Sequence, residues 1–237
     1  MLNIQDLSVT YPDGTEALRH VSLKLSPGET CGLIGGNGAG KTTLLMALVG
    51  LVQSQGSVRV GDTELTPKTL SKLRQQVGVV FQNPDDQLFL PTVYQNVAFG
   101  LQNMGLPEQQ VRKRSDKTLE LLGISALRDR QAQRLSGGEK RMAALATVLA
   151  MEPKLLLLDE PTAFLDPKAR RRLITVMQQL PQTMLVATHD LTFALETCRR
   201  CVVLTKGALF ADGASKELLF DEKTMEDGGV EAIGIYA

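Results

Sequence analysis

A glycine-rich stretch near the start of the chain has the residue types and spacing of a loop that holds phosphate groups. Gly35, Gly40, Lys41 and Thr42 satisfy the pattern G-x-x-x-x-G-K-[ST]. Glycines let backbone N–H groups surround an anion, the lysine neutralises it, and the threonine hydroxyl suits Mg²⁺. A chance glycine-rich turn is the alternative reading, but a strand before the loop and a helix after it favour phosphate binding. The candidate phosphate-binding residues are Gly35, Gly36, Asn37, Gly38, Ala39, Gly40, Lys41, Thr42 and Thr43.

Two carboxylates follow a run of four leucines later in the chain. The run 155–158 is typical of a buried strand, so Asp159 and Glu160 are expected at its carboxyl end, where open α/β sheets collect ligands. Asp159 is a candidate for the Mg²⁺ shell, and Glu160 for the base that polarises an attacking water. A solvated strand end is the alternative. His189 follows the apolar stretch 184–188 and is predicted at the same sheet edge, although a histidine there can also be a satisfied polar residue.

The stretch Leu135–Glu139 has the pattern of a helix start. Ser136 is a predicted N-cap, and Gly137 and Gly138 expose backbone N–H groups at the positive end of the helix. This arrangement is a second potential anion site. A small ATPase does not need two phosphate cradles for one nucleotide, so the second cradle suggests a nucleotide that another molecule holds.

The elements that must position these residues alternate between strands and helices. Alternating and buried apolar patterns predict strands at 2–9, 21–25, 30–34, 56–61, 77–81, 155–158, 184–188 and 201–205. Helical periods predict helices at 42–49, 70–76, 93–104, 108–122, 138–150, 168–180 and 191–197. This order indicates an α/β fold with a mostly parallel core sheet and an antiparallel β layer at the N-terminus.

We interpret the chain as one domain with an inserted helical subdomain. Residues 1–82 and 151–220 are predicted to form the core and the β layer, and residues 83–150 the helical subdomain. The sequence pattern indicates no role for the acidic tail, residues 221–237.

Composition excludes several classes of protein. The sequence has 26 Lys and Arg residues and 26 Asp and Glu residues, so there is no net positive charge that would favour nucleic-acid binding. The longest apolar run, 142–151, is about half of a bilayer crossing, and the N-terminus lacks a signal-peptide pattern, so we expect a cytoplasmic protein without a membrane span. Cys198 and Cys201 form a C-x-x-C pair without a matching second pair, and ordinary packing is favoured over metal or redox use.

Together these motifs resemble the nucleotide-binding subunit of an ATP-binding cassette (ABC) transporter, whose signature sequence is LSGGQ. The resemblance extends to about Phe220. It implies a P-loop ATPase that uses ATP and Mg²⁺. It also implies that two subunits, either identical or sister ATPases, meet head to tail, with each ATP lying between the phosphate loop of one and the signature of the other.

The resemblance also implies a role for each matching position. Tyr11 matches the aromatic residue that stacks on adenine, Gln82 the glutamine that touches Mg²⁺ and the attacking water, Asp166 the D-loop, and His189 the contact to the γ-phosphate. The implied catalytic residues are Glu160, His189 and Gln82, and the implied metal-binding residues are Thr42, Gln82 and Asp159. The nucleotide contacts outside the phosphate loop are Tyr11, Ser136, Gly137, Gly138 and Asp166.

Two residues depart from the family pattern. Glu139 replaces the usual glutamine of the signature and brings a carboxylate near a nucleotide, with modest consequences expected. Phe164 stands in the D-loop where the family often has a small residue, which puts the path of that loop in doubt.

The segment Asn83–Phe89 is similar to one in the ATPase subunits of energy-coupling factor (ECF) transporters, particularly those for cobalt, nickel or vitamins. The resemblance implies that residues 83–89 and the helical subdomain receive a transmembrane partner at the inner face of the cell membrane. Asp85 and Asp86 are expected to form an acidic rim, with Leu88 and Phe89 as apolar anchors; a polar loop with two core residues is the alternative. The rival functions are an ABC ATPase of another importer class, one of DNA repair or translation, and a nucleotide-regulated scaffold.

Overall fold

The computed structural model describes residues 1–234 of the chain. These residues form two compact units. The first contains Met1–Val77, Lys154–Glu160 and the chain from Pro181 onward, and the second contains Gly78–Pro153 and Pro161–Leu180. The chain therefore leaves the first unit twice and returns to it, so that the second unit is built from two insertions.

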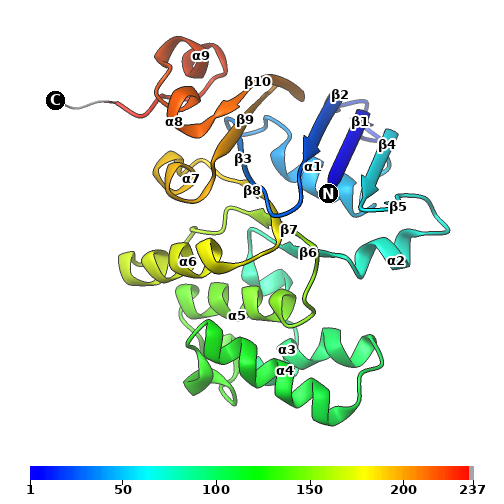
Figure 1. Cartoon of the computed structure of the whole chain (residues 1–237), viewed down its shortest axis with the longest axis vertical. Coiled ribbons are helices and arrows are strands. Elements are labelled where there is room, and N and C mark those ends of the chain that lie inside the picture. Colours follow the sequence, from blue (N-terminus) through cyan, green and yellow to red (C-terminus); the bar gives the residue numbers. More distant parts are fainter. Residues whose placement is uncertain (235–237) are drawn as a thin grey trace. The chain divides into compact units, whose positions relative to one another are not determined.

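An antiparallel sheet forms one layer of the first unit, as the alternating N-terminal pattern predicts. Its strands are β1 (Leu2–Thr10), β2 (Glu16–Leu25), β4 (Gln55–Val60) and β5 (Thr63–Glu64), in the order β2-β1-β4-β5. Leu2 lies opposite Leu25 of β2 and Val60 of β4, and all three side chains are buried. The strands lie side by side in Figure 1.

The core sheet of the first unit is mostly parallel, and its parallel strands are almost completely buried. Strands β3 (Thr30–Ile34), β7 (Leu155–Asp159), β8 (Thr183–Ala187) and β9 (Arg200–Thr205) run parallel, and β10 (Ala208–Ala214) pairs antiparallel with β9. The order of these strands in the sheet is β10-β9-β3-β8-β7. Strand β6 (Val77–Val80) begins at Val77, the last residue of the first unit before the chain enters the second unit. Because β3, β7 and β8 end at one edge, the residues that follow them come together there.

Short helices complete the first unit. They are α1 (Lys41–Leu48), α2 (Leu70–Arg74), α7 (Leu191–Thr197), α8 (Ser215–Leu218) and α9 (Glu222–Asp227). Strand β10 and helices α8 and α9 are absent from the sequence-based prediction, because their apolar periodicity is weak. Residues 235–237 of the predicted tail lie outside the described residues.

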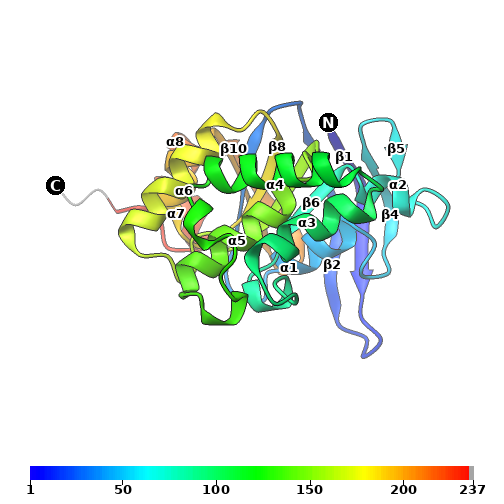
Figure 2. The same cartoon turned by 90° about the horizontal axis from the view of Figure 1, so that it is seen from below.

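The second unit is helical. It contains α3 (Val93–Asn103), α4 (Glu108–Leu121), α5 (Gly137–Leu149) and α6 (Pro167–Gln179), with 3₁₀ turns at Pro84–Asp86, Ser125–Leu127 and Ala132–Arg134. Helices α3, α4 and α5 pack against one another, and the three green helices lie side by side in Figure 2. Across residues 1–234, no helix is both long enough and apolar enough to cross a membrane.

Candidate functional site

The predicted phosphate loop joins β3 to α1 in the first unit. The Nζ atom of Lys41 is buried in the loop and donates to the backbone oxygens of Gly35 at 2.6 Å and Gly36 at 3.2 Å. Gly40 has a φ of 106°, and a methyl group there would lie 2.7 Å from the backbone oxygen of Ala17, so only glycine fits. The lysine amine therefore lies among backbone groups at the start of a helix, where an anion is favoured.

Two oxygen-bearing side chains meet beside the loop. The hydroxyl of Thr42 donates to Oδ2 of Asp159 at 2.8 Å, which joins the start of α1 to the end of β7. A hydroxyl next to a carboxylate is an oxygen donor set that Mg²⁺ prefers, so these residues fit that metal. One residue further along α1, the hydroxyls of Tyr11 and Thr43 lie 3.0 Å apart.

Glu160 follows Asp159 and is held in an unusual backbone conformation. Its φ is 46°, in the left-handed region, which costs about 1–2 kcal/mol for a residue with a Cβ atom. Its own N–H donates to the backbone oxygen of Ala187 on β8 at 2.8 Å. The strain and this bond hold a 7 % exposed carboxylate at the sheet edge.

Three groups from the end of β8 converge on Oε2 of Glu160. The hydroxyl of Thr188 donates to it at 3.2 Å, the backbone N–H of His189 donates at 3.3 Å, and Nδ1 of His189 lies 2.9 Å away. The predicted proximity of Glu160 and His189 is thus present. Thr188 was missed as a site residue, and its place directly before His189 at the end of a strand was the available signal.

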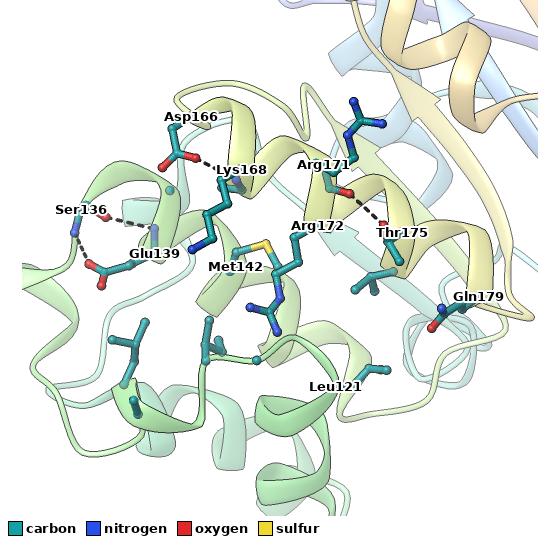
Figure 3. Close-up of a pocket in the computed structure, with 17 residues that line it drawn as sticks. Leu121, Ser136, Glu139, Met142, Asp166, Lys168, Arg171, Arg172, Thr175 and Gln179 are labelled. Carbon is teal, nitrogen blue, oxygen red and sulfur yellow. Dashed lines mark hydrogen bonds between the residues drawn. The ribbon is translucent and has the colours of Figure 1, made fainter.

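The predicted second anion site lies at the start of α5 in the second unit. Ser136 Oγ accepts from the N–H of Glu139 at 3.3 Å, and the Glu139 carboxylate accepts from the N–H of Ser136 at 2.8 Å. Figure 3 shows this reciprocal cap. Within residues 1–234, the N–H groups of Gly137 and Gly138 have no hydrogen-bond partner, so they can bind an anion.

The two signature glycines also have a packing role. A methyl group at Gly137 would lie 3.2 Å from Cβ of Phe164, and one at Gly138 would lie 3.6 Å from Cδ2 of Leu165. Asp166 caps the next helix, because its Oδ1 accepts from the N–H of Ala169 at 2.8 Å. The starts of α5 and α6 therefore lie close together.

The two departures from the family pattern have structural consequences. Phe164 has a φ of 66° and is 74 % exposed, so its position suits a glycine and its ring contributes little to the core. Glu139 acts as the partner of Ser136 in the helix cap, as a glutamine also can.

A pocket of about 690 Å³ extends from this helix start between α5 and α6. Its apolar wall includes Met142 and Val176, and its polar wall includes Lys168 and Arg172. The Arg172 guanidinium packs directly over Gly123, so a side chain at position 123 would require the guanidinium to move.

Gln82 is exposed in the second unit, and its backbone is held by a buried arginine. Arg141 is 1 % exposed, and its guanidinium donates to the backbone oxygens of Phe81, at 2.6 Å, and Gln82. Arg141 lies on α5, one turn after the signature residues. Sequence reasoning missed Arg141, which has the appearance of an ordinary surface arginine in the sequence.

The segment 83–89 combines exposed and buried residues. Asp85 Oδ1 accepts from Nζ of Lys140 at 2.6 Å, so its negative charge is partly compensated. Leu88 is only 7 % exposed, and the prediction that it is an anchor for a partner is wrong because the side chain belongs to the core. Phe89 is 62 % exposed, and its ring lies edge-on to that of Phe99 with centroids 5.1 Å apart.

The three cysteines are buried in the first unit. Burial raises the pKa of Cys198 to about 12 and raises the pKa of Cys31 and Cys201. Sγ of Cys201 lies 3.2 Å from Oγ of Ser215. Among the described residues, no group of three or more His, Cys, Asp or Glu side chains could hold a metal ion. The three cysteines are free thiols in the interior of the first unit.

The predicted site residues thus divide between the two units. The first unit brings together Tyr11, the loop Gly35–Thr43, Asp159, Glu160 and His189. The second unit contains Gln82, Ser136, Gly137, Gly138 and Asp166. A phosphate loop between a parallel strand and a helix, with carboxylates at the end of a second parallel strand of the same sheet, defines a P-loop ATPase.

Comparison with known proteins identifies the family. The family model described as ABC transporter matches residues 18–163. A putative ABC transporter ATP-binding protein of Gloeobacter violaceus is 49 % identical over 97 % of this chain and 96 % of the relative. The chain therefore belongs to the ABC transporter ATP-binding family, and it is an ATPase.

Other relatives are similar over most of the chain. The energy-coupling factor transporter ATP-binding protein EcfA of Methanothermobacter thermautotrophicus is 43 % identical over 93 % of this chain and 73 % of the relative. The structure of cbiO1 from Clostridium perfringens, part of the ABC transporter complex cbiONQ, has a TM-score of 0.84 and 37 % identity, covering 95 % of this chain and 93 % of that one. The cassette MJ0796, in a dimeric post-hydrolysis state with ADP and Pi, has a TM-score of 0.83 and 27 % identity, covering 91 % and 99 %. The predicted ABC ATPase fold, with a mostly parallel core sheet and an antiparallel layer, is confirmed.

Proposed function

We propose that this chain is the ATP-hydrolysing subunit of an ECF-type importer, for cobalt, nickel or a vitamin. The similarity to EcfA and to cbiO1 of the cbiONQ complex supports the importer class. The observation that carries the catalytic assignment is the group of three contacts from Thr188 and His189 to one oxygen of Glu160, beside the phosphate loop.

In this proposal Glu160 is the base that orients and polarises the attacking water. The bonds from Thr188 and His189 occupy Oε2, which leaves Oε1 for the water. His189 is well placed to contact the γ-phosphate as well, because its side chain is 75 % exposed while Glu160 is buried. Lys41 would neutralise the phosphates, and Tyr11 would stack on adenine. Thr42, Asp159 and Gln82 would hold Mg²⁺, which supplies charge neutralisation at the phosphates.

The second part of the proposal is that two copies, or this chain and a sister ATPase, share each ATP. The open N–H groups of Gly137 and Gly138 are suited to phosphate, and Asp166 lies at the adjacent helix start. The dimeric form of the related cassette MJ0796 supports this arrangement. ATP would join the two chains, and hydrolysis would remove the γ-phosphate contact and open the pair.

The third part concerns the membrane partner. We infer that residues 83–89 and the helical subdomain receive a transmembrane subunit, which keeps the chain at the inner face of the membrane. Phe89 supports this, because an exposed aromatic residue beside acidic side chains suits a basic amphipathic helix.

Co-purification from membranes tests the importer class. The chain should copurify with a transmembrane subunit, and F89A should reduce recovery at least fivefold without lowering basal ATPase activity. F210A is the matched control, since Phe210 is 48 % exposed on β10 in the first unit. Equal recovery of F89A and the wild type would contradict the docking assignment, whereas copurification with nucleic acid or ribosomes would favour a non-transport ATPase.

A further inference from the structure

The phosphate loop is braced from outside by other parts of the first unit. Gly35 packs against the backbone oxygen of Leu204 at the end of β9. The N–H of Gly207, in the turn between β9 and β10, donates to the backbone oxygen of Ala39 at 3.0 Å. Several glycines make this loop intrinsically mobile, so contacts of this kind reduce the entropy that must be lost when phosphate binds.

The C-terminal segment supplies a further brace. A methyl group at Gly36 would lie 3.2 Å from the backbone oxygen of Gly229, so the segment that follows α9 lies directly against the loop. The hydroxyl of Thr205 donates to the backbone oxygen of Gly228 at 2.6 Å. A methyl group at Gly228 would lie 2.8 Å from Cγ1 of Val203, so the chain passes close to β9. One bond and two close contacts thus fix the segment between β9 and the loop.

This segment is itself hydrogen-bonded and packed within the first unit. Oδ1 of Asp221 accepts from the N–H of Thr224 at 3.1 Å and begins α9. Met225 is fully buried, and the N–H of Ile233 donates to the backbone oxygen of Leu219 at 2.9 Å. Figure 1 shows α9, in red, after α8 and β10 in the same unit. The brace therefore rests on a folded element on both sides of Gly228 and Gly229.

We propose that the C-terminal segment 221–233 is a positioning element of the nucleotide site, and that Thr205 is the residue that fastens it. The segment restricts Gly36 and so keeps the phosphate loop in a binding-competent form. If the segment is loosened, a smaller fraction of the molecules has a phosphate loop in the binding-competent form, and the apparent affinity for ATP falls by the same factor. Because such coupling is reciprocal, ATP must in turn stabilise the segment. The inference rests on the assignment of Gly35–Thr43 to the phosphates of ATP.

T205V tests this role, since it removes the hydroxyl and keeps the shape of the side chain. Losing one hydrogen bond to a buried carbonyl is expected to weaken ATP binding about threefold to tenfold. The KM for ATP should rise by the same factor, while kcat stays within about twofold, because Thr205 does not touch the reacting atoms. T205S keeps the hydroxyl and should restore the wild-type KM.

T197V is the matched control. The Thr197 hydroxyl donates to the backbone oxygen of Phe193 at 2.7 Å, within α7 and away from the phosphate loop. The T197V variant should lose about as much thermal stability as T205V and keep the wild-type affinity for ATP. The inference is overturned if T205V binds ATP as tightly as the wild type, if T197V loses affinity as much as T205V does, or if T205S shares the defect of T205V.

Hydrogen exchange on the unmodified protein gives an independent test. The amides of Gly228, Gly229 and Val230 donate within this turn, and ATP should slow their exchange about threefold to tenfold. Unchanged exchange in saturating ATP overturns the inference, even if T205V fails to fold. The K41A variant separates the assignment of the phosphate loop from the assignment of the brace. If K41A binds ATP normally, the assignment of Gly35–Thr43 to the phosphates fails. If K41A loses ATP binding and T205V does not, only the proposed role of the C-terminal segment is refuted.

Discussion

The substitution of Gly138 by alanine separates packing from anion binding at the start of α5. Gly138 lies outside the left-handed region, and its added methyl group would lie 3.6 Å from Cδ2 of Leu165 and 3.8 Å from Cβ of Ala169. These are ordinary van der Waals distances. Because alanine is favoured over glycine in a helix by about 0.5–1 kcal/mol, G138A should raise the free energy of unfolding by up to that amount.

ATP hydrolysis by the same variant should fall. The methyl group stands next to the open N–H groups of Gly137 and Gly138, where the phosphate of the second nucleotide would lie. Weakening a hydrogen bond to a charged group costs about 1.5–3 kcal/mol, which corresponds to about a tenfold to hundredfold loss of kcat/KM. The measurements are urea unfolding and phosphate release on the same preparation.

G137A is the comparison, because its methyl group would lie only 3.2 Å from Cβ of Phe164. It should be less stable than G138A, since Phe164 must move by a few tenths of an ångström to accommodate it. If G138A unfolds more easily than the wild type, the packing reasoning is wrong. If it is stable and hydrolyses ATP at the wild-type rate, Gly138 does not form a phosphate cradle.

Two further predictions concern the first unit. E160Q should reduce the rate of ATP turnover about a hundredfold or more, yet leave an ATP-stabilised dimer in size-exclusion chromatography. E120Q on α4 is the control. If E160Q hydrolyses ATP at the wild-type rate, Glu160 is not the catalytic base. The buried thiols should resist alkylation at pH 8, because burial raises the pKa of Cys198 to about 12 from an ordinary 9.0 and raises that of Cys201. The Cys198 thiol ionises first in the unfolded protein, so between about pH 9 and about pH 12 it lowers the free energy of unfolding by about 1.4 kcal/mol per pH unit. A C198A variant with an unchanged slope in urea titrations would contradict this.

The motifs that depend on neighbouring residues could be predicted from the sequence. The phosphate loop, the helix start at Ser136 and the carboxylates at the end of β7 each occupy fewer than ten consecutive residues, and their chemistry follows from residue type and spacing. The apolar periods of most strands and helices were equally clear. Weakly periodic elements such as β10 and α9 were missed, since they are stabilised by packing instead of by their own pattern.

Contacts between residues distant in the sequence could be known only from the tertiary structure. The sequence by itself predicted a phosphate loop, an acidic strand end and a second potential anion site. It did not determine that Thr188 holds Glu160, that Arg141 holds the backbone at Gln82, or that Leu88 is buried. These contacts depend on which surfaces meet when strands and helices pack, and a local pattern of residue types does not determine which surfaces meet. The contact of Gly229 with the phosphate loop belongs to the same class, because Gly36 and Gly229 are 193 positions apart in the sequence.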